Sequence, residues 1–534
     1  MKCEDRILHK NTSLAIWEWN KDNILDFKIP NFIAFLRSNR AMHIVTLIFL
    51  FVTYGIRMTF YSTTLDQDGM MANPPSTSYQ SWFSLGRFGL IYLRQAFRMA
   101  ELNPFFELAF TVFFIFAACI SWEYVFYAIG GKSDRFRPIR WIFPIIFLTS
   151  PLLAMQFNFL NQNFFVSLCF ILMAFSLLFL YKWIFQHTWL DLAISLFLAV
   201  ICFSTYQAFI PFYISAAAAS FLLIYRRYCF LPKNKVSSHF SSIVICLKIL
   251  LTFIIALILY LVIGRLIAVH HGGITSYIYG QVMWGNAPVS QCIHSILSSG
   301  KRILAGQGPF YNLAFPITVG ALIIVLLVKI RHLYKGYLFF LIAAAIFVLS
   351  PFFMTFLMGT EPNMRTQFSL PFVVAFGLEF LISLIPVAYG KSRALAALFC
   401  VLVAFDQAEI TDRLFYTQYV TYQQDAAYCT QIAHSIAELG IGEFPSLPVV
   451  LVGSRYAHLN KDTIRGDEVG LSTFETESIS PSGTLLFMRT LGLNYVVPTS
   501  EQFKKGAQIS TDMPIWPAQN SIQVRDNMII VKLS

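Results

Sequence analysis

Two acidic residues lie directly after the first long apolar run, within the segment Thr64-Leu65-Asp66-Gln67-Asp68-Gly69. If this segment is extended, side chains two residues apart point to the same side, so Asp66 and Asp68 would face one ligand. Such a pair can coordinate a hard cation, or share the roles of base and orienting group toward a substrate hydroxyl. The alternatives are a solvated loop and an acidic cap at the start of a helix.

A second candidate group follows in the segment 84–99, whose periodicity predicts an amphipathic helix. Its apolar side chains fall on one face, and Arg87, Arg94 and Arg98 fall together on the opposite face. This pattern is typical of a helix that lies flat on a membrane surface. The arginines are suited to a lipid phosphate, because a guanidinium can fork onto two phosphate oxygens. Simple anchoring to lipid headgroups explains the pattern equally well.

Further polar residues gather in turns between apolar runs that we place on the same side of the membrane. Amides would bind sugar hydroxyls, and an arginine would bind a phosphate. These residues are Asn158, Asn161, Gln162 and Asn163 in one turn, Thr205, Tyr206 and Gln207 in a second, and Glu361 and Arg365 in a third.

One acidic residue, Glu379, lies near the middle of an apolar run, where a charge is costly. It is either hydrogen-bonded within a helix bundle or part of a proton or ion path. The second interpretation keeps open an alternative function, a lipid-linked glycan flippase or another polytopic transporter.

The elements that must position these residues are membrane helices. Of the 534 residues, 57% are hydrophobic and only 13% are charged, whereas a soluble domain carries about 25% charged residues. Apolar runs of about 20 residues are long enough to cross the hydrocarbon core as helices. We therefore predict a polytopic α-helical membrane protein with about eleven spans, near 42–62, 104–128, 141–157, 163–184, 189–205, 207–225, 243–268, 313–330, 336–357, 367–388 and 394–410.

The net charge of +11 is spread over short loops between these runs, which argues against binding to nucleic acid. The positive-inside rule places the basic loops in the cytoplasm. These loops contain Lys132, Arg135, Arg137 and Arg140; Lys182; Arg226, Arg227, Lys233 and Lys235; Lys329, Arg331 and Lys335; and Lys391 and Arg393. The basic segment 1–40 is then cytoplasmic, and an odd number of spans places the C-terminus outside.

Three segments are accordingly expected outside: the loops 63–103 and 269–312, and the tail 411–534. The tail differs in character from the transmembrane region 41–410. It contains an amphipathic stretch at 426–439, a short apolar strand at 448–452, and two runs at 521–524 and 528–533 that are typical of a β-hairpin. We predict a small extracytoplasmic α/β domain of about 120 residues, long enough to bury its own core.

Taken together, these residues resemble the Gtr-type O-antigen serotype-converting glucosyltransferases, which belong to the GT-C superfamily of membrane glycosyltransferases. The resemblance rests on the acidic pair in the first loop, Gly86-Arg87-Phe88-Gly89, Tyr206-Gln207-Ala208, and Pro514-Ile515-Trp516-Pro517 before the closing hairpin. It covers most of the chain as a layout, although the motifs are short.

The resemblance implies an enzyme that moves a sugar, most simply glucose, from an undecaprenyl-phosphate-linked donor to a lipid-linked O-antigen acceptor. Transfer would take place at the outer, periplasmic face of the bacterial inner membrane, with both substrates held in membrane lipid. The catalytic acid of the first loop carries over to Asp66 or Asp68, and the proposed substrate-binding residues are Arg87, Arg365, Tyr206, Gln207, Asn161 and Asn163. Some members of the superfamily need a divalent metal such as Mg²⁺ or Mn²⁺ and others do not, and the sequence leaves both open.

Overall fold

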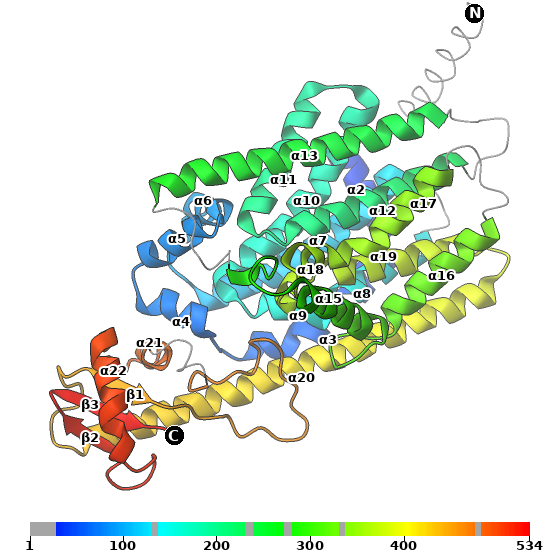
Figure 1. The fold of residues 1–534 in the computed structure, drawn as a ribbon. Coiled ribbons are helices and arrows are strands. Elements are labelled where there is room, and N and C mark those ends of the chain that lie inside the picture. Colours follow the sequence, from blue (N-terminus) through cyan, green and yellow to red (C-terminus); the bar gives the residue numbers. More distant parts are fainter. Residues whose placement is uncertain (1–27, 131–136, 230–238, 272–279, 330–336, 476–481) are drawn as a thin grey trace, which may run out of the picture.

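The computed structural model describes residues 28–130, 137–229, 239–271, 280–329, 337–475 and 482–534. Most of the described chain is helical, and Figure 1 shows long helices packed side by side in one bundle. At one end of the bundle lie the short helices α4 (Leu65–Ala72), α5 (Pro75–Ser84) and α6 (Phe88–Ala96), of which α4 is close to the C-terminal tail.

Seven helical segments of the described chain are long and apolar enough to cross a membrane. They are α3 (Arg40–Thr59), α7 (Pro104–Gly130), α10 (Leu160–Gln186), α12 (Phe209–Cys229), α13 (His239–His270), the run α17–η3–α18 (Tyr337–Leu349, Ser350–Phe352 and Phe353–Met358), and α20 (Gly390–Ala437). Shorter apolar helices are α11 (Trp189–Thr205), α16 (Ala314–Lys329) and α19 (Ser369–Leu384). The chain is therefore a polytopic helical membrane protein.

The predicted run 141–157 is not one helix. It consists of α8 (Ile142–Thr149) and α9 (Pro151–Phe157), which meet at Ser150. Pro151 causes this break, because its ring removes a backbone donor and clashes with the preceding turn. Each of the eleven predicted apolar runs coincides with helical structure, while the number of membrane crossings stays a prediction.

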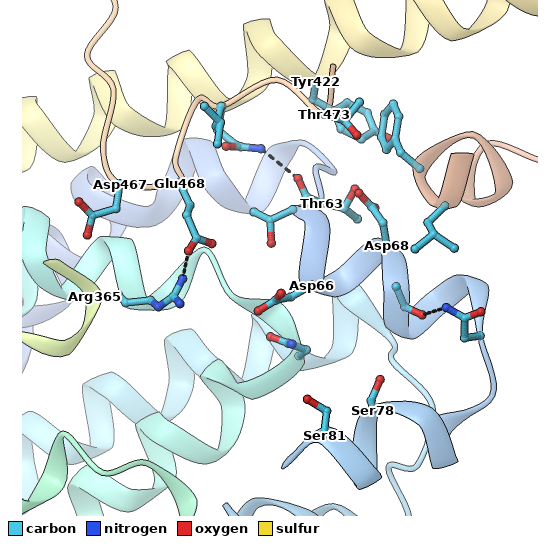
Figure 2. Close-up of a pocket in the computed structure, with 18 of the residues that line it drawn as sticks. Thr63, Asp66, Asp68, Ser78, Ser81, Arg365, Tyr422, Asp467, Glu468 and Thr473 are labelled. Atoms are coloured by element: carbon cyan, nitrogen blue, oxygen red, sulfur yellow. Dashed lines mark hydrogen bonds and ion pairs between the residues drawn. The ribbon is translucent and has the colours of Figure 1, made fainter. Parts of the chain in front are cut away.

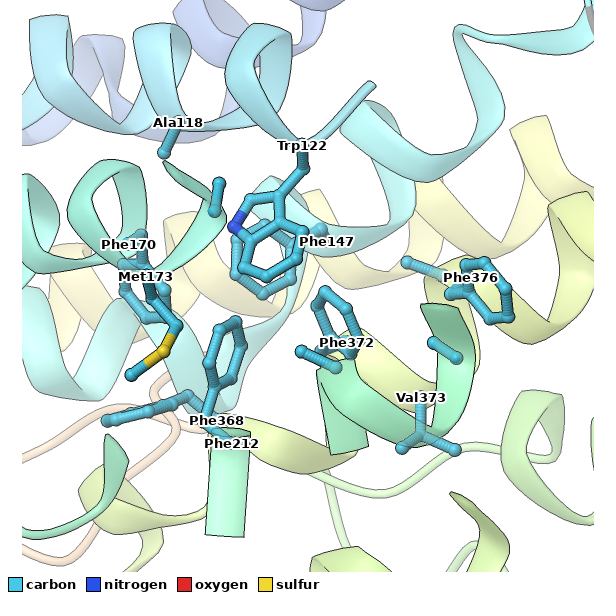
Figure 3. Packing of buried hydrophobic residues seen from close by; sticks show 14 of the residues in the cluster. Ala118, Trp122, Phe147, Phe170, Met173, Phe212, Phe368, Phe372, Val373 and Phe376 are labelled. Carbon is cyan, nitrogen blue, oxygen red and sulfur yellow. The ribbon is translucent and has the colours of Figure 1, made fainter. Parts of the chain in front are cut away.

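Aromatic side chains fill the middle of the bundle, as Figure 3 shows around Trp122, Phe212 and Phe372. The ring of Phe372 lies 4.9 Å from that of Trp122 and 4.8 Å from that of Phe212, with interplanar angles of 69° and 64°. Such edge-to-face contacts add to the packing that holds helices together in lipid. In the same core Glu379 is buried, and its carboxylate accepts the Phe143 N–H at 3.3 Å. Of the two interpretations of Glu379, hydrogen bonding within the bundle is the one that this contact supports.

The predicted single helix over 84–99 is wrong. Helix α5 ends at Ser84, Gly86 adopts a left-handed conformation with φ of +73°, and α6 starts at Phe88. Arg87 precedes α6, Arg98 follows it with a left-handed φ of +56°, and Arg94 within the helix is fully buried in an ion pair with Glu107 at 2.8 Å. The expected arginine stripe on a flat surface helix therefore does not form.

The loop predicted at 269–312 contains a further helix, α15 (Val289–Leu304). Part of this loop lies outside the described residues. So do the first 27 residues of the predicted cytoplasmic segment and several predicted cytoplasmic basic residues: Lys132, Arg135, Lys233, Lys235, Arg331 and Lys335. The orientation of the chain in the membrane stays a prediction.

Helix α20 is 48 residues long, which corresponds to about 72 Å. Hydrocarbon about 30 Å thick covers less than half of that length, so the helix extends well beyond the bundle into the tail (Figure 1). The predicted domain boundary at 411 falls inside this continuous helix. Whether 411–534 folds as a separate domain stays a prediction.

The tail forms the small sheet that the strand patterns predict. Its order is β1–β3–β2, with β1 (Val449–Val452) parallel to β3 (Met528–Lys532) and β2 (Ile522–Arg525) antiparallel to β3. Helices α21 (Gly483–Thr490) and α22 (Ser500–Ile509) precede the hairpin. The far end of α20 packs on this sheet through Cys429, Ile432 and Ile436. This packing fixes the sheet to the far end of α20.

Candidate active site

A cavity of about 840 Å³ lies where the first loop, the turn before α19 and the C-terminal tail meet. Polar and charged side chains make up much of its wall, and Figure 2 shows Asp66, Asp68 and Arg365 around it. The lining includes Thr63, Asp66, Asp68, Asn73, Thr77, Ser78, Ser81, Trp82, Arg87, Asn161, Arg365, Gln418, Thr421, Tyr422, Asp425, Asp467, Glu468, Ser472 and Thr473.

The acidic pair lies on a helix rather than on an extended segment. Thr64 precedes α4, and the Gln67 side chain accepts the Thr64 N–H at 3.3 Å and donates to the Asn158 carbonyl at 2.6 Å. These bonds fix the start of α4 against the turn before α10. On a helix, residues two apart point about 200° away from each other, so the expectation of a shared direction is wrong. Asp66 is exposed, whereas Asp68 turns toward α20 and is only 2% exposed.

Burial changes the acid strength of Asp68. Loss of water around the carboxylate, together with the negative charges of Asp425 and Asp66, raises the pKa of Asp68 to about 8. Its Oδ1 atom is buried and has no hydrogen-bond partner among the residues that the structure describes. A carboxyl group with a pKa near neutrality and a free oxygen at a cavity wall is suited to accept a proton from a bound ligand.

Two arginines also line the cavity. Arg365, in the short helix η4 (Met364–Thr366), lies 4.3 Å above the Phe159 ring and forms an ion pair with Glu468. Arg87 lies 4.9 Å above the Tyr206 ring, and its Nε donates to Gln207 Oε1 at 3.4 Å. Aromatic rings under both guanidinium groups hold them in place while leaving charge directed at the cavity.

Of the substrate-binding residues predicted from sequence, Arg87, Asn161 and Arg365 line the cavity together with Asp66 and Asp68. Tyr206 and Gln207 contact Arg87 instead, so they support a wall residue.

Asn163 lies away from the lining. It accepts the Thr111 hydroxyl at 2.9 Å and donates to the Phe157 carbonyl at 2.9 Å. These bonds make it a structural link between α7 and α10, and its contact with a substrate stays a prediction.

The cavity residues on the tail side were not predicted from the sequence. Gln418 on α20 donates to the Thr63 carbonyl at 3.0 Å and accepts the Gly470 N–H at 2.7 Å, which joins the first loop to the tail. Asp425 accepts the Ser472 hydroxyl at 2.5 Å and the Thr473 N–H at 2.8 Å. Gln418, Thr421, Tyr422 and Asp425 are spaced as one face of a helix, and this polar periodicity was the available signal.

The carboxylates of the cavity are possible ligands of a metal ion. Among the described residues, no group of three or more His, Cys, Asp and Glu side chains is arranged to hold one. The carboxylates that the sequence suggested for a cation, Asp66 and Asp68, point apart on α4.

Fold and cavity together define the class: a polytopic membrane protein with a polar, charged chamber at one end of a helix bundle. A family model described as "Glucosyl transferase GtrII" matches residues 43–382, which is more than half of the 534 residues. The chain belongs to this glucosyltransferase family, and the resemblance to Gtr-type enzymes is confirmed. No curated protein and no solved structure matches the chain.

The family assignment supports a glycosyltransferase that uses a sugar donor and a glycan acceptor. The matched range contains Asp66, Asp68, Arg87 and Arg365. Three acidic residues of the cavity wall, Asp425, Asp467 and Glu468, lie beyond it.

Proposed function

We propose that this cavity transfers glucose from a polyprenyl-phosphate donor, such as undecaprenyl-phosphate glucose, to a lipid-linked O-antigen acceptor. One observation carries the proposal: Asp66 and Asp68 line the same cavity as Arg365, although about 300 residues separate them in sequence. A base and a cationic phosphate site are the two functions that this transfer requires. Both lie at a bundle end that substrates anchored in lipid reach laterally.

Asp68 is the better candidate for the base. Its raised pKa makes it the stronger proton acceptor once ionised, and its free Oδ1 can accept a hydrogen bond from an acceptor hydroxyl. Asp66, which is exposed at the same wall, is placed to orient the sugars.

The reaction is a single displacement. The acceptor oxygen attacks the anomeric carbon, the bond from that carbon to the phosphate oxygen breaks, and Asp68 takes the acceptor proton. The departing polyprenyl phosphate keeps the bonding electron pair, so negative charge builds on its oxygens. Arg365 and Arg87 stabilise that charge in a site of restricted water access. One displacement inverts the configuration at the anomeric carbon.

This function fixes an orientation. The N-terminus lies in the cytoplasm, about eleven spans follow in a GT-C-like arrangement, and the cavity and the tail face the periplasm of the bacterial inner membrane. Reporters active on only one side of the membrane, fused at Lys132, Lys233 and Ser534, test it. We expect cytoplasmic signals from the first two positions and a periplasmic signal from Ser534. A cytoplasmic signal from Ser534 would contradict the proposed periplasmic site.

The catalytic assignment is tested by glucose transfer in liposomes that contain the purified protein, undecaprenyl-phosphate glucose and the lipid-linked acceptor. Asp68→Asn is expected to lose on the order of 10²–10⁴-fold in rate, which is the usual scale of acid–base catalysis. Asp66→Asn is expected to lose less. Asp412→Asn is the matched control, since this carboxylate lies on α20 outside the cavity lining. Wild-type rates for both first-loop variants would remove the cavity from the mechanism.

A further inference from the structure

The segment 464–475, called the strap below, forms the tail side of the cavity. It is fastened to α20 at three places: the Ile464 N–H donates to Thr417 at 2.9 Å, the Gly470 N–H donates to Gln418, and the Thr473 N–H donates to Asp425. Asp467 adds a bond, because its carboxylate accepts the N–H of Met364, next to Arg365. The strap therefore holds its next residue, Glu468, at a fixed place in the cavity wall.

Glu468 directs its carboxylate at Arg365, as Figure 2 shows. The Arg365 side chain is 13% exposed and the Glu468 side chain is 35% exposed, so cavity water reaches the carboxylate more readily than the guanidinium. A carboxylate and a phosphate bind a guanidinium with the same two-oxygen geometry. Glu468 therefore occupies the position that a phosphate needs for contact with Arg365.

The net charge of the cavity determines what an anion gains or loses when it meets the Glu468–Arg365 pair. Five carboxyl groups line it, from Asp66, Asp68, Asp425, Asp467 and Glu468, against two guanidinium groups, from Arg87 and Arg365. Asp68 is protonated at neutral pH because its pKa is about 8, and the remaining carboxyl groups still outnumber the arginines. An anionic headgroup that entered without moving Glu468 would meet an excess of negative charge and an arginine already paired. An anion that displaces Glu468 gains Arg365 and sends one carboxylate toward water.

We propose that Glu468 is a specificity-determining residue of the transfer reaction: its carboxylate occupies the phosphate position on Arg365 until a lipid-linked sugar phosphate displaces it. The inference rests on the proposed function. Because displacement has a cost, a small anion gains too little to bind. A donor with a sugar and a prenyl chain makes enough additional contacts to displace the carboxylate, so the site selects the whole donor over free phosphate.

The test compares wild-type protein with Glu468→Gln, which keeps the shape of the side chain and removes its charge. The probes are decaprenyl phosphate and inorganic phosphate, with binding to the purified protein measured in detergent. Removing a partly exposed competing charge is expected to tighten decaprenyl phosphate binding about fivefold. In the transfer assay the donor KM is expected to fall without a rise in kcat, because the phosphate-bearing product is also held more tightly.

Glu475→Gln is the matched control. Glu475 lies on the same strap and pairs with Arg465 at 2.8 Å, but it is not part of the cavity lining. This variant is expected to leave both binding constants unchanged. In an Arg365→Gln background, Glu468→Gln is expected to have no effect, since the competition needs the guanidinium. Glu468→Asp, which keeps the charge on a shorter side chain, is expected to bind decaprenyl phosphate with intermediate affinity.

The outcomes separate the two proposals. Unchanged decaprenyl phosphate affinity in Glu468→Gln, with wild-type binding and transfer intact, overturns the role of Glu468 and leaves the proposed function standing. Tighter binding of inorganic phosphate alone shows a site for free phosphate and overturns the lipid-linked assignment. A wild-type protein that neither binds decaprenyl phosphate nor transfers glucose overturns both.

Discussion

Replacing Asp68 with asparagine is expected to slow transfer on the order of 10²–10⁴-fold and, at the same time, to stabilise the folded protein. The sequence alone places this residue in a surface loop, where a lost charge would hardly matter, but the structure buries it. The folded-state pKa is about 8, against an ordinary value of 3.8. Folding therefore favours the protonated form, and an ionised Asp68 opposes folding.

The size of the effect follows from the linkage between protonation and folding. At pH 7 the unfolded chain gains free energy from ionisation that the folded chain almost entirely lacks, and the difference has an upper limit of about 4 kcal/mol. The sign is fixed by the raised pKa. Wild-type stability falls as the pH rises from about 4 to about 8, and it loses nothing more from this group at higher pH. Asparagine has no charge to bury, so the advantage of Asp68→Asn is largest above pH 8.

Thermal unfolding of the purified proteins in detergent, at pH 5, 7 and 9, measures this difference. The unfolding temperature of Asp68→Asn is expected to exceed that of the wild type, by a margin that grows from pH 5 to pH 9. Asp66→Asn is the control, because Asp66 lies on the same helix and is exposed. A variant that unfolds at or below the wild-type temperature at pH 9 would refute the argument that Asp68 is held in an unfavourable environment.

Three further predictions concern the cavity and its support. The transfer rate is expected to fall about tenfold per pH unit below about pH 8, because Asp68 must be ionised to act as a base. Asp425→Asn is expected to shift this fall in rate to lower pH, because it removes a negative charge that raises the pKa of Asp68. Transfer rates measured between pH 6 and 9 check both. Arg365→Lys is expected to lose at least about tenfold in kcat/KM for the donor while still inserting into membranes, since lysine lacks the guanidinium fork. Glu107→Gln leaves the buried Arg94 without its ionic partner and is expected to destabilise the protein by about 3–5 kcal/mol, measured as a lower unfolding temperature.

The sequence was most informative where one physical requirement acts on a whole segment. A helix in lipid needs an apolar run of fixed length, and every predicted run is helical in the structure. Local turns were harder, because they depend on one or two residues. The helix predicted over 84–99 is interrupted at Gly86, Arg94 is buried by its ion pair with Glu107, and the bonds between Thr64 and Gln67 make the acidic segment a helix.

The residues of the candidate site that could not be predicted from the sequence lie in the tail. Placing Asp425 and Glu468 requires knowing that α20 continues well past the hydrocarbon as one helix and that the strap then folds back along it. Neither is visible in a composition window or in a short motif. Arg365 was predicted as a phosphate ligand from its place in a turn, but its pairing with a residue about 100 positions later depends on the tertiary fold.

The tail also changes how the chemistry of the first loop is understood. Without α20 and the strap, Asp68 would lie on an open surface and would titrate as an ordinary acid. Tyr422 and Asp425 on α20, and Ser472 and Thr473 on the strap, line the cavity with it, so they help to exclude water from this wall. The same tail brings the carboxylate that pairs with Arg365. In the proposed reaction, therefore, the tail has a direct role in the chemistry: it contributes to the strength of the base and controls access to the phosphate site.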